Sequence, residues 1–345
     1  MVRRILILIG LSIALGAAAS GVWMWQGTEP FKGYEGSEQF VDLLPGDGTP
    51  AIARKLVAAG VVRDRWTFRL ELWRNGAARR LKAGEYRFDR AMRASEVVSM
   101  LARGEVYLRP VTFPEGLTVR EMSRIFESHG LGSAESFVTA ARDQAALVGD
   151  LDPDARDLEG YLFPETYSLS RHAGAVELVR MMVARFRQVF TPDLREGAAA
   201  RGLSPREAVT LASLVEKETA QAGERPVVAG VYLNRLRLRM ALQCDPTVVF
   251  ALEAKGQYQG NLTRENLQVN SPYNTYRFPG LPPGPIAAPG RSSLDAAAHA
   301  EAVDYLYFVS RNDGTHVFAR TLDEHNRNVQ KYQRDYFRQR RQDEH

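Results

Sequence analysis

The amino-acid sequence predicts an α+β protein made of an N-terminal transmembrane helix, a small α/β module and a helix-rich domain with a short antiparallel sheet. Three observations predict this class. Residues 5–25 form one uncharged run, strand and helix signals alternate over residues 40–108, and helical patterns dominate the rest. With 345 residues, 45% of them hydrophobic and 25% charged, the chain is long enough for more than one globular domain.

Composition excludes several classes of protein. The 15 Phe and 13 Tyr residues exclude a chain that is mainly disordered. A formal net charge of +4 is too balanced to favour nucleic acid as a partner. The single cysteine, Cys244, excludes an internal disulfide framework and a multi-cysteine zinc site. The six histidines lack metal-ligand spacings such as His-Glu-x-x-His, so we expect no metal and no other cofactor.

The first 25 residues indicate the cellular location. About 20 apolar helical residues cross a bilayer core, so residues 5–25 are predicted to be a transmembrane anchor. Arg3 and Arg4 precede this run, and the positive-inside rule therefore keeps residues 1–4 in the cytoplasm. We expect a single-pass protein of the cytoplasmic membrane with its bulk outside, in the periplasm. The alternative is a cleaved signal peptide with its cut near Ala17–Ala19, and the sequence does not decide whether the helix is retained.

The next segment is predicted to be a linker followed by the small module. Residues 26–39 are polar and contain glycine, as flexible linkers do. Thr49 is expected to cap the first helix of the module and Ser95 to open the last. The expected elements are a strand at 40–43, a helix from 50 to about 60, a helix at 65–73, a strand at 81–88 and a helix at 95–101.

Residues 109–335 are predicted to form the helix-rich domain, and residues 336–345 a tail. Residues 275–290 are rich in Pro and Gly and are predicted to be a long ordered loop. The strand signals at 305–309 and 316–318 flank an Asn-Asp-Gly turn and predict a hairpin. Helices are expected at 118–128, 133–143, 175–190, 205–219 and 227–236, and a polar surface helix at 321–341.

The helix predicted over 205–219 carries the clearest chemical signal. Ser204 and Glu207 match a capping box at its start. Glu216 and Glu218 flank its apolar face, and helical periodicity barely separates them. A carboxyl group at such an edge loses hydration, which raises its pKa and suits a general acid near neutral pH. The alternative is a helix-end acid in an ordinary ion pair.

Polar and aromatic blocks follow this helix. Their amides, hydroxyls and aromatic faces together suit a neutral polyhydroxylated ligand such as a sugar chain. Each block alone is explained at least as well by a turn or by core packing. The blocks are Asn234–Leu236, Leu242–Gln243, Asp245–Val248, Tyr273–Tyr276 and Gly280–Gly284.

Together with Lys82–Tyr86, Glu159–Pro164, Leu211–Thr219 and Leu306–Val309, these blocks resemble the YceG-like endolytic murein transglycosylase (MltG) family. The resemblance extends from the anchor to about residue 332. It implies a LysM-like module at residues 40–108 and a catalytic domain at residues 109–335 that cuts peptidoglycan strands internally. Cys244 and Ala300 depart from the family pattern, in which Thr and Pro are commoner.

The resemblance also implies a reaction and its partners. A lytic transglycosylase cleaves between N-acetylmuramic acid (MurNAc) and N-acetylglucosamine (GlcNAc) and leaves a 1,6-anhydroMurNAc end. The family's catalytic acid maps onto Glu218, which would act as acid and then as base. We expect Gln243, Tyr273, Asn274 and Tyr276 to bind the sugar chain. The implied partners are nascent peptidoglycan strands and, through the N-terminal helix, the membrane; peptidoglycan synthases are a further partner that the resemblance allows.

Two alternatives stay open at this point. A hydrolase would need a second carboxylate, for which Glu216, Glu224, Asp245 and Glu159 are the candidates; we expect none of them to serve. We also expect Glu224 to form an ion pair with Arg225. An alternative of a different class is a membrane-tethered, non-catalytic peptidoglycan-binding protein.

Overall fold

The computed structural model describes residues 29–338, and within them the protein is α+β, rich in helix and with short two-stranded sheets. The predicted anchor at 5–25 lies outside the described residues. Within residues 29–338, no helix is both long and apolar enough to cross a membrane. The chain divides into two compact units. We call them the N-terminal unit (described residues 29–110 and 168–172) and the C-terminal unit (residues 111–167 and 173–338).

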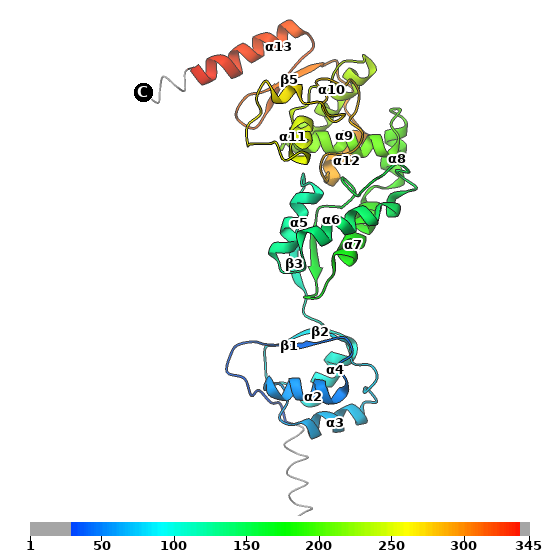
Figure 1. The fold of residues 1–345 in the computed structure, drawn as a ribbon, viewed down its shortest axis with the longest axis vertical. Coiled ribbons are helices and arrows are strands. Elements are labelled where there is room, and N and C mark those ends of the chain that lie inside the picture. Colours follow the sequence, from blue (N-terminus) through cyan, green and yellow to red (C-terminus); the bar gives the residue numbers. More distant parts are fainter. Residues whose placement is uncertain (1–28, 339–345) are drawn as a thin grey trace, which may run out of the picture. The chain divides into compact units, whose positions relative to one another are not determined.

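The N-terminal unit has the order of elements that the sequence predicts (Figure 1). Its elements are β1 (Gln39–Leu43), α2 (Thr49–Ala58), α3 (Arg65–Arg74), β2 (Gly84–Phe88) and α4 (Ala94–Arg103). The two strands pair antiparallel, with Val41 opposite Tyr86. Two predicted helix starts are wrong, because α2 is preceded by Gly48 at its N-cap and α4 by Arg93.

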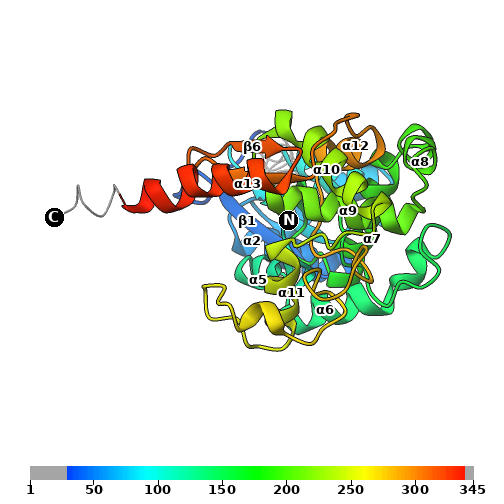
Figure 2. The ribbon, with the colours of Figure 1, turned by 90° about the horizontal axis from the view of Figure 1, so that it is seen from above.

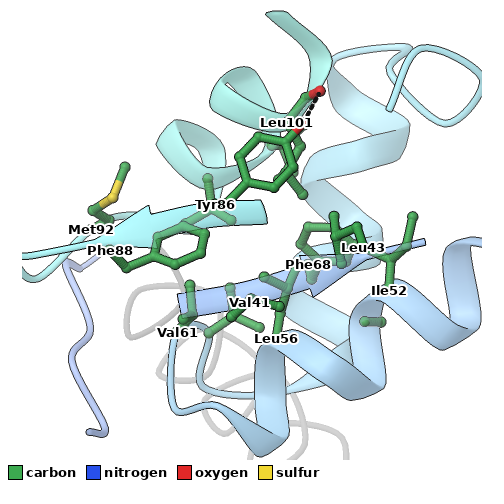
Figure 3. Close-up of a cluster of buried hydrophobic side chains, with 14 of the residues drawn as sticks. Val41, Leu43, Ile52, Leu56, Val61, Phe68, Tyr86, Phe88, Met92 and Leu101 are labelled. Atoms are coloured by element: carbon green, nitrogen blue, oxygen red, sulfur yellow. Dashed lines mark hydrogen bonds between the residues drawn. The ribbon is translucent and has the colours of Figure 1, made fainter. Parts of the chain in front are cut away.

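One hydrophobic core holds this unit together (Figure 3). Leu56, Phe68 and Tyr86 are fully buried, and each such side chain contributes on the order of 1.5–3 kcal/mol through its loss of contact with water. The Tyr86 hydroxyl is buried as well, and it donates to the backbone oxygens of Lys82 and Leu101 at 2.8 and 3.4 Å. The core therefore pins α4 to the end of β2 by a polar contact as well as by apolar packing.

The unit also recruits charges from later in the chain. Glu85 on β2 is buried, and its carboxylate pairs with Arg109 at 2.7 Å and with Arg171 at 3.2 Å. His172 lies 2.8 Å from Asp42. A buried carboxylate is stable only when cations or hydrogen bonds replace its water. The short segment Ser168–His172 thus completes a unit that otherwise ends near Pro110.

The C-terminal unit is built around α9 (Pro205–Glu218), which contacts α8, α10, α11 and α12; Figures 1 and 2 show α10 and α12 beside it. Every residue from Ala208 to Val215 is buried, as expected of a helix surrounded by others. The elements of this unit are β3 (Arg109–Thr112), α5 (Val119–Ser128), α6 (Ala134–Asp143), β4 (Thr166–Leu169), α7 (Ala175–Val189), α8 (Pro192–Ala199), α9, α10 (Arg225–Arg237), α11 (Asp245–Ala254), α12 (Arg291–Ala298), β5 (Tyr307–Ser310), β6 (His316–Ala319) and α13 (Leu322–Val329). The division between the units falls within β3 and within β4 along the chain. A π-helical stretch (Gln330–Asp335) continues α13.

Most predicted elements of this unit are confirmed. The capping box of Ser204 and Glu207 is present at the start of α9, and the predicted hairpin is the antiparallel pair β5–β6. Three helices were not predicted: α8, α11 and α12. The predicted loop at 275–290 runs along α9, where the Ile286 amide donates to Ser213 Oγ at 3.0 Å. Burial of Ile286, Ala287 and Ala288 accounts for its order.

Candidate active site

The carboxyl group of Glu218 lies at the C-terminal end of α9, where the backbone turns extended at Thr219. It is half-buried, and its Oε2 accepts hydrogen bonds from the Tyr232 hydroxyl at 3.1 Å and from Cys244 Sγ at 3.5 Å. Burial raises the pKa of Glu218, and the nearby charge of Asp245 raises it further. The two hydrogen bonds lower this pKa only in part. Glu218 therefore keeps its proton to a higher pH than an exposed glutamate, as a general acid requires.

Two further helices place the partners of Glu218. Tyr232 is buried on α10, and its ring packs edge-on against Phe308 of β5 at 5.9 Å. Cys244 is the N-cap residue of α11, and its amide donates to Thr275 Oγ1 at 3.0 Å. The ends of α9 and α11 thus meet the middle of α10 at one carboxyl group.

Glu216, which periodicity could not separate from Glu218, is a structural residue. Its carboxylate pairs with Arg225 at 2.8 Å and accepts the Gly290 amide at 2.9 Å, and its side chain is only 5% exposed. Arg225 also lies 3.7 Å from Glu115. Glu216 therefore fastens the loop before α12 to the start of α10 and has no contact left to offer a ligand.

Glu224 is also paired, but not as predicted. Its carboxylate accepts the His316 amide at 2.8 Å, His316 Nδ1 at 2.7 Å and Thr219 Oγ1 at 3.1 Å. Burial alone would raise the pKa of Glu224, but the hydrogen bonds from His316 outweigh it and the pKa is lowered. The expected ion pair between Glu224 and Arg225 is therefore wrong. Glu224 instead joins the end of α9 to the β5–β6 hairpin.

Two of the predicted sugar-binding residues lie at the Glu218 end of α11. Gln243 is exposed and adopts a left-handed backbone conformation (φ +51°) directly before Cys244. Such a conformation is uncommon for a residue other than glycine and marks a constrained position. Tyr276 is half-buried and donates its hydroxyl to Asp245. Burial and this contact with Asp245 raise the pKa of Tyr276.

The other two predicted sugar-binding residues, Tyr273 and Asn274, differ in how deeply they are buried. The Tyr273 ring is half-buried and lies 4.9 Å from the ring of Phe250 on α11. Asn274 is fully buried; its amide nitrogen donates to the backbone oxygens of Leu267 and Val269, both at 2.9 Å, and its Oδ1 accepts the Tyr276 amide. The expectation that Asn274 binds the sugar chain stays a prediction, and in the structure its polar atoms have backbone partners. Its polar atoms shape the loop that carries the two tyrosines.

A large cavity in the described part of the chain lies away from Glu218. It measures about 820 Å³ and is lined by Ser204, Thr210, Asn234 and the loop at Gly280–Pro282, at the other end of α9. At 1.5 Å per helical residue, Ser204 and Glu218 are about 20 Å apart. A smaller cavity of about 220 Å³ has Lys217 and Asp245 in its lining. In residues 29–338, no group of three or more His, Cys, Asp and Glu side chains is arranged to hold a metal ion.

The comparison with known families bears on the whole of this arrangement. Residues 41–331, from β1 to the π-helical stretch after α13, match the sequence model of the YceG-like family. The chain belongs to the YceG-like family. The match includes Glu218, Tyr232 and Cys244, so the convergence of α9, α10 and α11 lies inside the family domain.

Two curated relatives carry the same name. The endolytic murein transglycosylase of Bacillus subtilis is 30% identical over 307 residues, covering 85% of this chain and 84% of that protein. The endolytic murein transglycosylase of Streptococcus pneumoniae is 30% identical over 319 residues, covering 84% of this chain. This chain spans only 57% of the length of the pneumococcal protein.

A solved structure agrees with the fold. The crystal structure of a yceG-like protein from Listeria monocytogenes shares 30% sequence identity with this chain, with a TM-score of 0.58. The alignment covers 84% of this chain and 98% of that one. Sequence reasoning pointed to Glu218 but missed Tyr232 and Cys244 as its hydrogen-bond partners. No local pattern marks them, because they follow Glu218 by 14 and 26 residues and meet it only in the fold.

Proposed function

We propose that this member of the YceG-like family is an endolytic peptidoglycan lytic transglycosylase that cleaves glycan strands between MurNAc and GlcNAc. The observation that carries the proposal is the Glu218 carboxyl group, half-buried, raised in pKa and held by Tyr232 and Cys244. Relatives named endolytic murein transglycosylase support it, because two of them align over more than four fifths of this chain.

In the proposed reaction one carboxyl group does the proton chemistry. Protonated Glu218 donates its proton to the glycosidic oxygen, the C1–O bond of MurNAc breaks, and GlcNAc leaves with a free 4-hydroxyl. The C6 hydroxyl of the same MurNAc then attacks C1, and the Glu218 carboxylate takes up the C6 hydroxyl proton. The C1–O6 bond that forms closes the 1,6-anhydro ring. The acid is regenerated and no water is consumed.

The neighbouring carboxylates favour this route over hydrolysis. A hydrolase places a second carboxyl group about 5–9.5 Å from the first, where it acts as nucleophile or activates water. Glu216 is engaged by Arg225 and Gly290, and Glu224 by His316. Asp245 accepts the Tyr276 hydroxyl. None of these acids has the unengaged carboxylate that a second catalytic group would need.

The N-terminal unit is proposed to be a LysM-like glycan-binding module, and residues 5–25 a membrane anchor. The strand–helix–helix–strand order of β1, α2, α3 and β2 supports the first proposal. The uncharged run behind Arg3 and Arg4 supports the second. A short linker would keep the enzyme near the periplasmic face of the cytoplasmic membrane, where new strands and their synthases are found. The linker would thereby raise the effective concentration of the enzyme there.

Mass analysis of reaction products tests the proposed activity. Purified protein incubated with uncrosslinked glycan strands should release fragments with 1,6-anhydroMurNAc ends. Each fragment should be lighter than the hydrolytic product by one water, about 18 Da. Glu218→Gln should abolish the release while its circular dichroism spectrum matches that of the wild type. Water-derived reducing ends would contradict the lyase mechanism. Intact strands that nevertheless bind the protein would favour the non-catalytic binding protein instead.

A further inference from the structure

A groove runs along one face of α11 in the C-terminal unit. One cavity, of about 220 Å³, and a second, of about 340 Å³, share Thr118, Phe250 and Glu253 in their linings. Asp245 and Val249 line the first cavity and Ala254 the second. These residues recur at helical spacing on one side of α11, so the two cavities are parts of one continuous depression.

The near end of the groove adjoins Glu218. Lys217 precedes Glu218 in the chain and lines the first cavity. Asp245, also in this lining, directly follows Cys244, whose Sγ lies 3.5 Å from Glu218 Oε2. Tyr276 donates its hydroxyl to the same Asp245. Glu218 itself is absent from the linings of both cavities, so a polymer with its scissile bond at Glu218 would reach this groove past Asp245.

The middle of the groove offers both apolar and polar contacts. Phe250 lines both cavities, and its ring is backed by that of Tyr273 at 4.9 Å. Val138 on α6, which is 41% exposed, lines the opposite wall. Glu253, which lines both cavities, adds a carboxylate. Aromatic faces with a few hydrogen-bonding groups are what an amphipathic ring such as a sugar needs.

The far end of the groove carries arginines from three segments. Arg120 on α5, Arg142 on α6 and Arg156 before Glu159 all line the second cavity. Among the described residues, Arg142 pairs only with its neighbour Asp143, at 3.4 Å with both side chains exposed. Within residues 29–338, Arg120 and Arg156 form no ion pair.

The acids in this lining leave an excess of positive charge. Burial raises the pKa of Glu159 to about 8, so its carboxyl group is mostly uncharged near neutral pH, and it accepts the Val119 amide. Asp157 and Glu253 remain against three arginines. Guanidinium groups match carboxylates through paired hydrogen bonds, so this end suits an anionic ligand carrying carboxylates.

We propose that the groove binds the peptide-bearing portion of the glycan strand, and that Arg120 and Arg156 bind carboxylates of the stem peptide carried by MurNAc. This inference rests on the proposed function, because the occupant is the substrate of Glu218. The sugar ring lies against Phe250, and the stem reaches the arginines beyond it. The enzyme consequently discriminates in favour of strands whose stem peptides are still attached.

The test compares two substrates with the full-length protein in detergent. Glycan strands with intact stem peptides are prepared alongside the same strands stripped of stems by an amidase. For the wild type, kcat/KM should be higher on the stem-bearing strands. Arg156→Ala and Arg120→Ala should each lower the ratio of the two kcat/KM values by about tenfold, as expected for one charge-assisted hydrogen bond. The loss should appear in KM, because both arginines lie away from the reacting bond.

Arg124→Ala is the matched control. Arg124 is exposed on α5, one turn beyond Arg120, and is absent from the lining of both cavities. In Arg124→Ala, the ratio of kcat/KM on stem-bearing strands to kcat/KM on stripped strands should equal that of the wild type. Equal kcat/KM on both substrates, or an unchanged ratio in Arg120→Ala and Arg156→Ala, would overturn the groove inference while leaving the activity in place. Wild-type protein that cleaves neither substrate would overturn the proposed function itself.

Discussion

Two hydrogen bonds determine how far the pKa of Glu218 rises. Burial pushes this pKa upward, whereas the Tyr232 hydroxyl and Cys244 Sγ stabilise the carboxylate form and lower it. A carboxyl group that must first give and then take back a proton needs this compromise. With no donors it would hold its proton too firmly, and in full contact with water it would lose the proton below neutral pH.

Tyr232→Phe should move the pH profile of cleavage. Removing the hydroxyl deletes a hydrogen bond that lowers the pKa of Glu218, so this pKa should rise further. The active acid form then persists to higher pH, and the alkaline limb of kcat/KM should shift toward higher pH. The measurement is the rate of anhydro-end formation between pH 5 and 9.

Tyr305→Phe provides the control for this prediction. Tyr305 packs against Phe318, and its hydroxyl makes no hydrogen bond to the described part of the chain. Its pH profile should match the wild type. An alkaline limb that stays in place in Tyr232→Phe, or that moves toward lower pH, would mean that Tyr232 does not act on the proton of Glu218.

Glu159 makes stability depend on pH. Its pKa is about 8 in the folded protein, chiefly because it is buried, against an ordinary value of 4.5. The folded chain therefore holds this proton longer than the unfolded chain. The associated stability is fully present below pH 4.5 and is lost as the pH rises through 8, by at most about 1.4 kcal/mol per pH unit.

Glu159→Gln should remove this dependence. The amide oxygen can still accept the Val119 amide, but nothing ionises. Relative to the wild type, the variant should gain free energy of unfolding between pH 5 and pH 8. Urea unfolding at intervals of one pH unit measures the difference. The exposed Glu135→Gln is the control and should show no such trend; a Glu159→Gln difference that is constant with pH would contradict the burial argument.

At the scale of elements, Gly160 determines how closely the loop at 275–290 approaches α9. Gly160 has φ +81°, and a Cβ there would lie 2.4 Å from Pro285 and 3.3 Å from Val209. Gly160→Ala should therefore lose stability twice, through the left-handed backbone and through the collision. We expect a loss of about 3 kcal/mol in the free energy of unfolding measured in urea.

Gly280→Ala separates these two costs. Gly280 also has a positive φ, +97°, but a Cβ there meets nothing within 4 Å. Its loss should be only about 1 kcal/mol, the backbone part alone. Similar losses in the two variants would show that the loop yields at Pro285 and is not pressed against α9.

The elements that sequence reasoning found are those with local signals. The Ser204–Glu207 capping box marked the start of α9, and strand signals on both sides of a turn marked the β5–β6 hairpin. Among the missed helices, α12 lacks such a signal, because its N-cap is Gly290 and makes no side-chain cap hydrogen bond. The buried residues of α12 are mostly alanines that pack against α9, and α12 begins at Arg291 directly after a Pro/Gly-rich loop. Only its tertiary partner makes it a helix.

The candidate site, like the fold, could be predicted from the sequence only in part. The resemblance singled out Glu218, but periodicity could not distinguish it from Glu216. The distinction is made by Arg225, Gly290 and Tyr232, which are remote along the chain. Asn274 was expected to bind the sugar chain, although its side-chain amide already donates hydrogen bonds to the backbone oxygens of Leu267 and Val269. A composition suited to sugars does not reveal which polar groups already have partners.

At the scale of the whole molecule, the N-terminal unit is not one continuous stretch of sequence, because it also includes the later segment Ser168–His172. The predicted module ends at residue 108, yet both cations that pair with buried Glu85 lie beyond it, at Arg109 and Arg171. A fragment of residues 29–108 would leave a buried carboxylate with neither partner. Removing the partner of a buried charge costs about 3–5 kcal/mol, a large share of the stability of a small module.

This fragment should therefore be unstable for an electrostatic reason that one substitution relieves. The fragment 29–108 should unfold at much lower urea concentration than the same residues within the full chain, and Glu85→Gln should stabilise the fragment. In the full chain the same substitution should destabilise, because it leaves Arg109 and Arg171 without their anion. The urea midpoints are measured by circular dichroism and tryptophan fluorescence. Glu85→Gln raises the midpoint of the fragment and lowers that of the full chain only if these arginines neutralise Glu85. Glu38→Gln, at an exposed position of the same unit, is the control and should change neither midpoint appreciably. A stable wild-type fragment would show that residues 29–108 complete their own core without the returning segment.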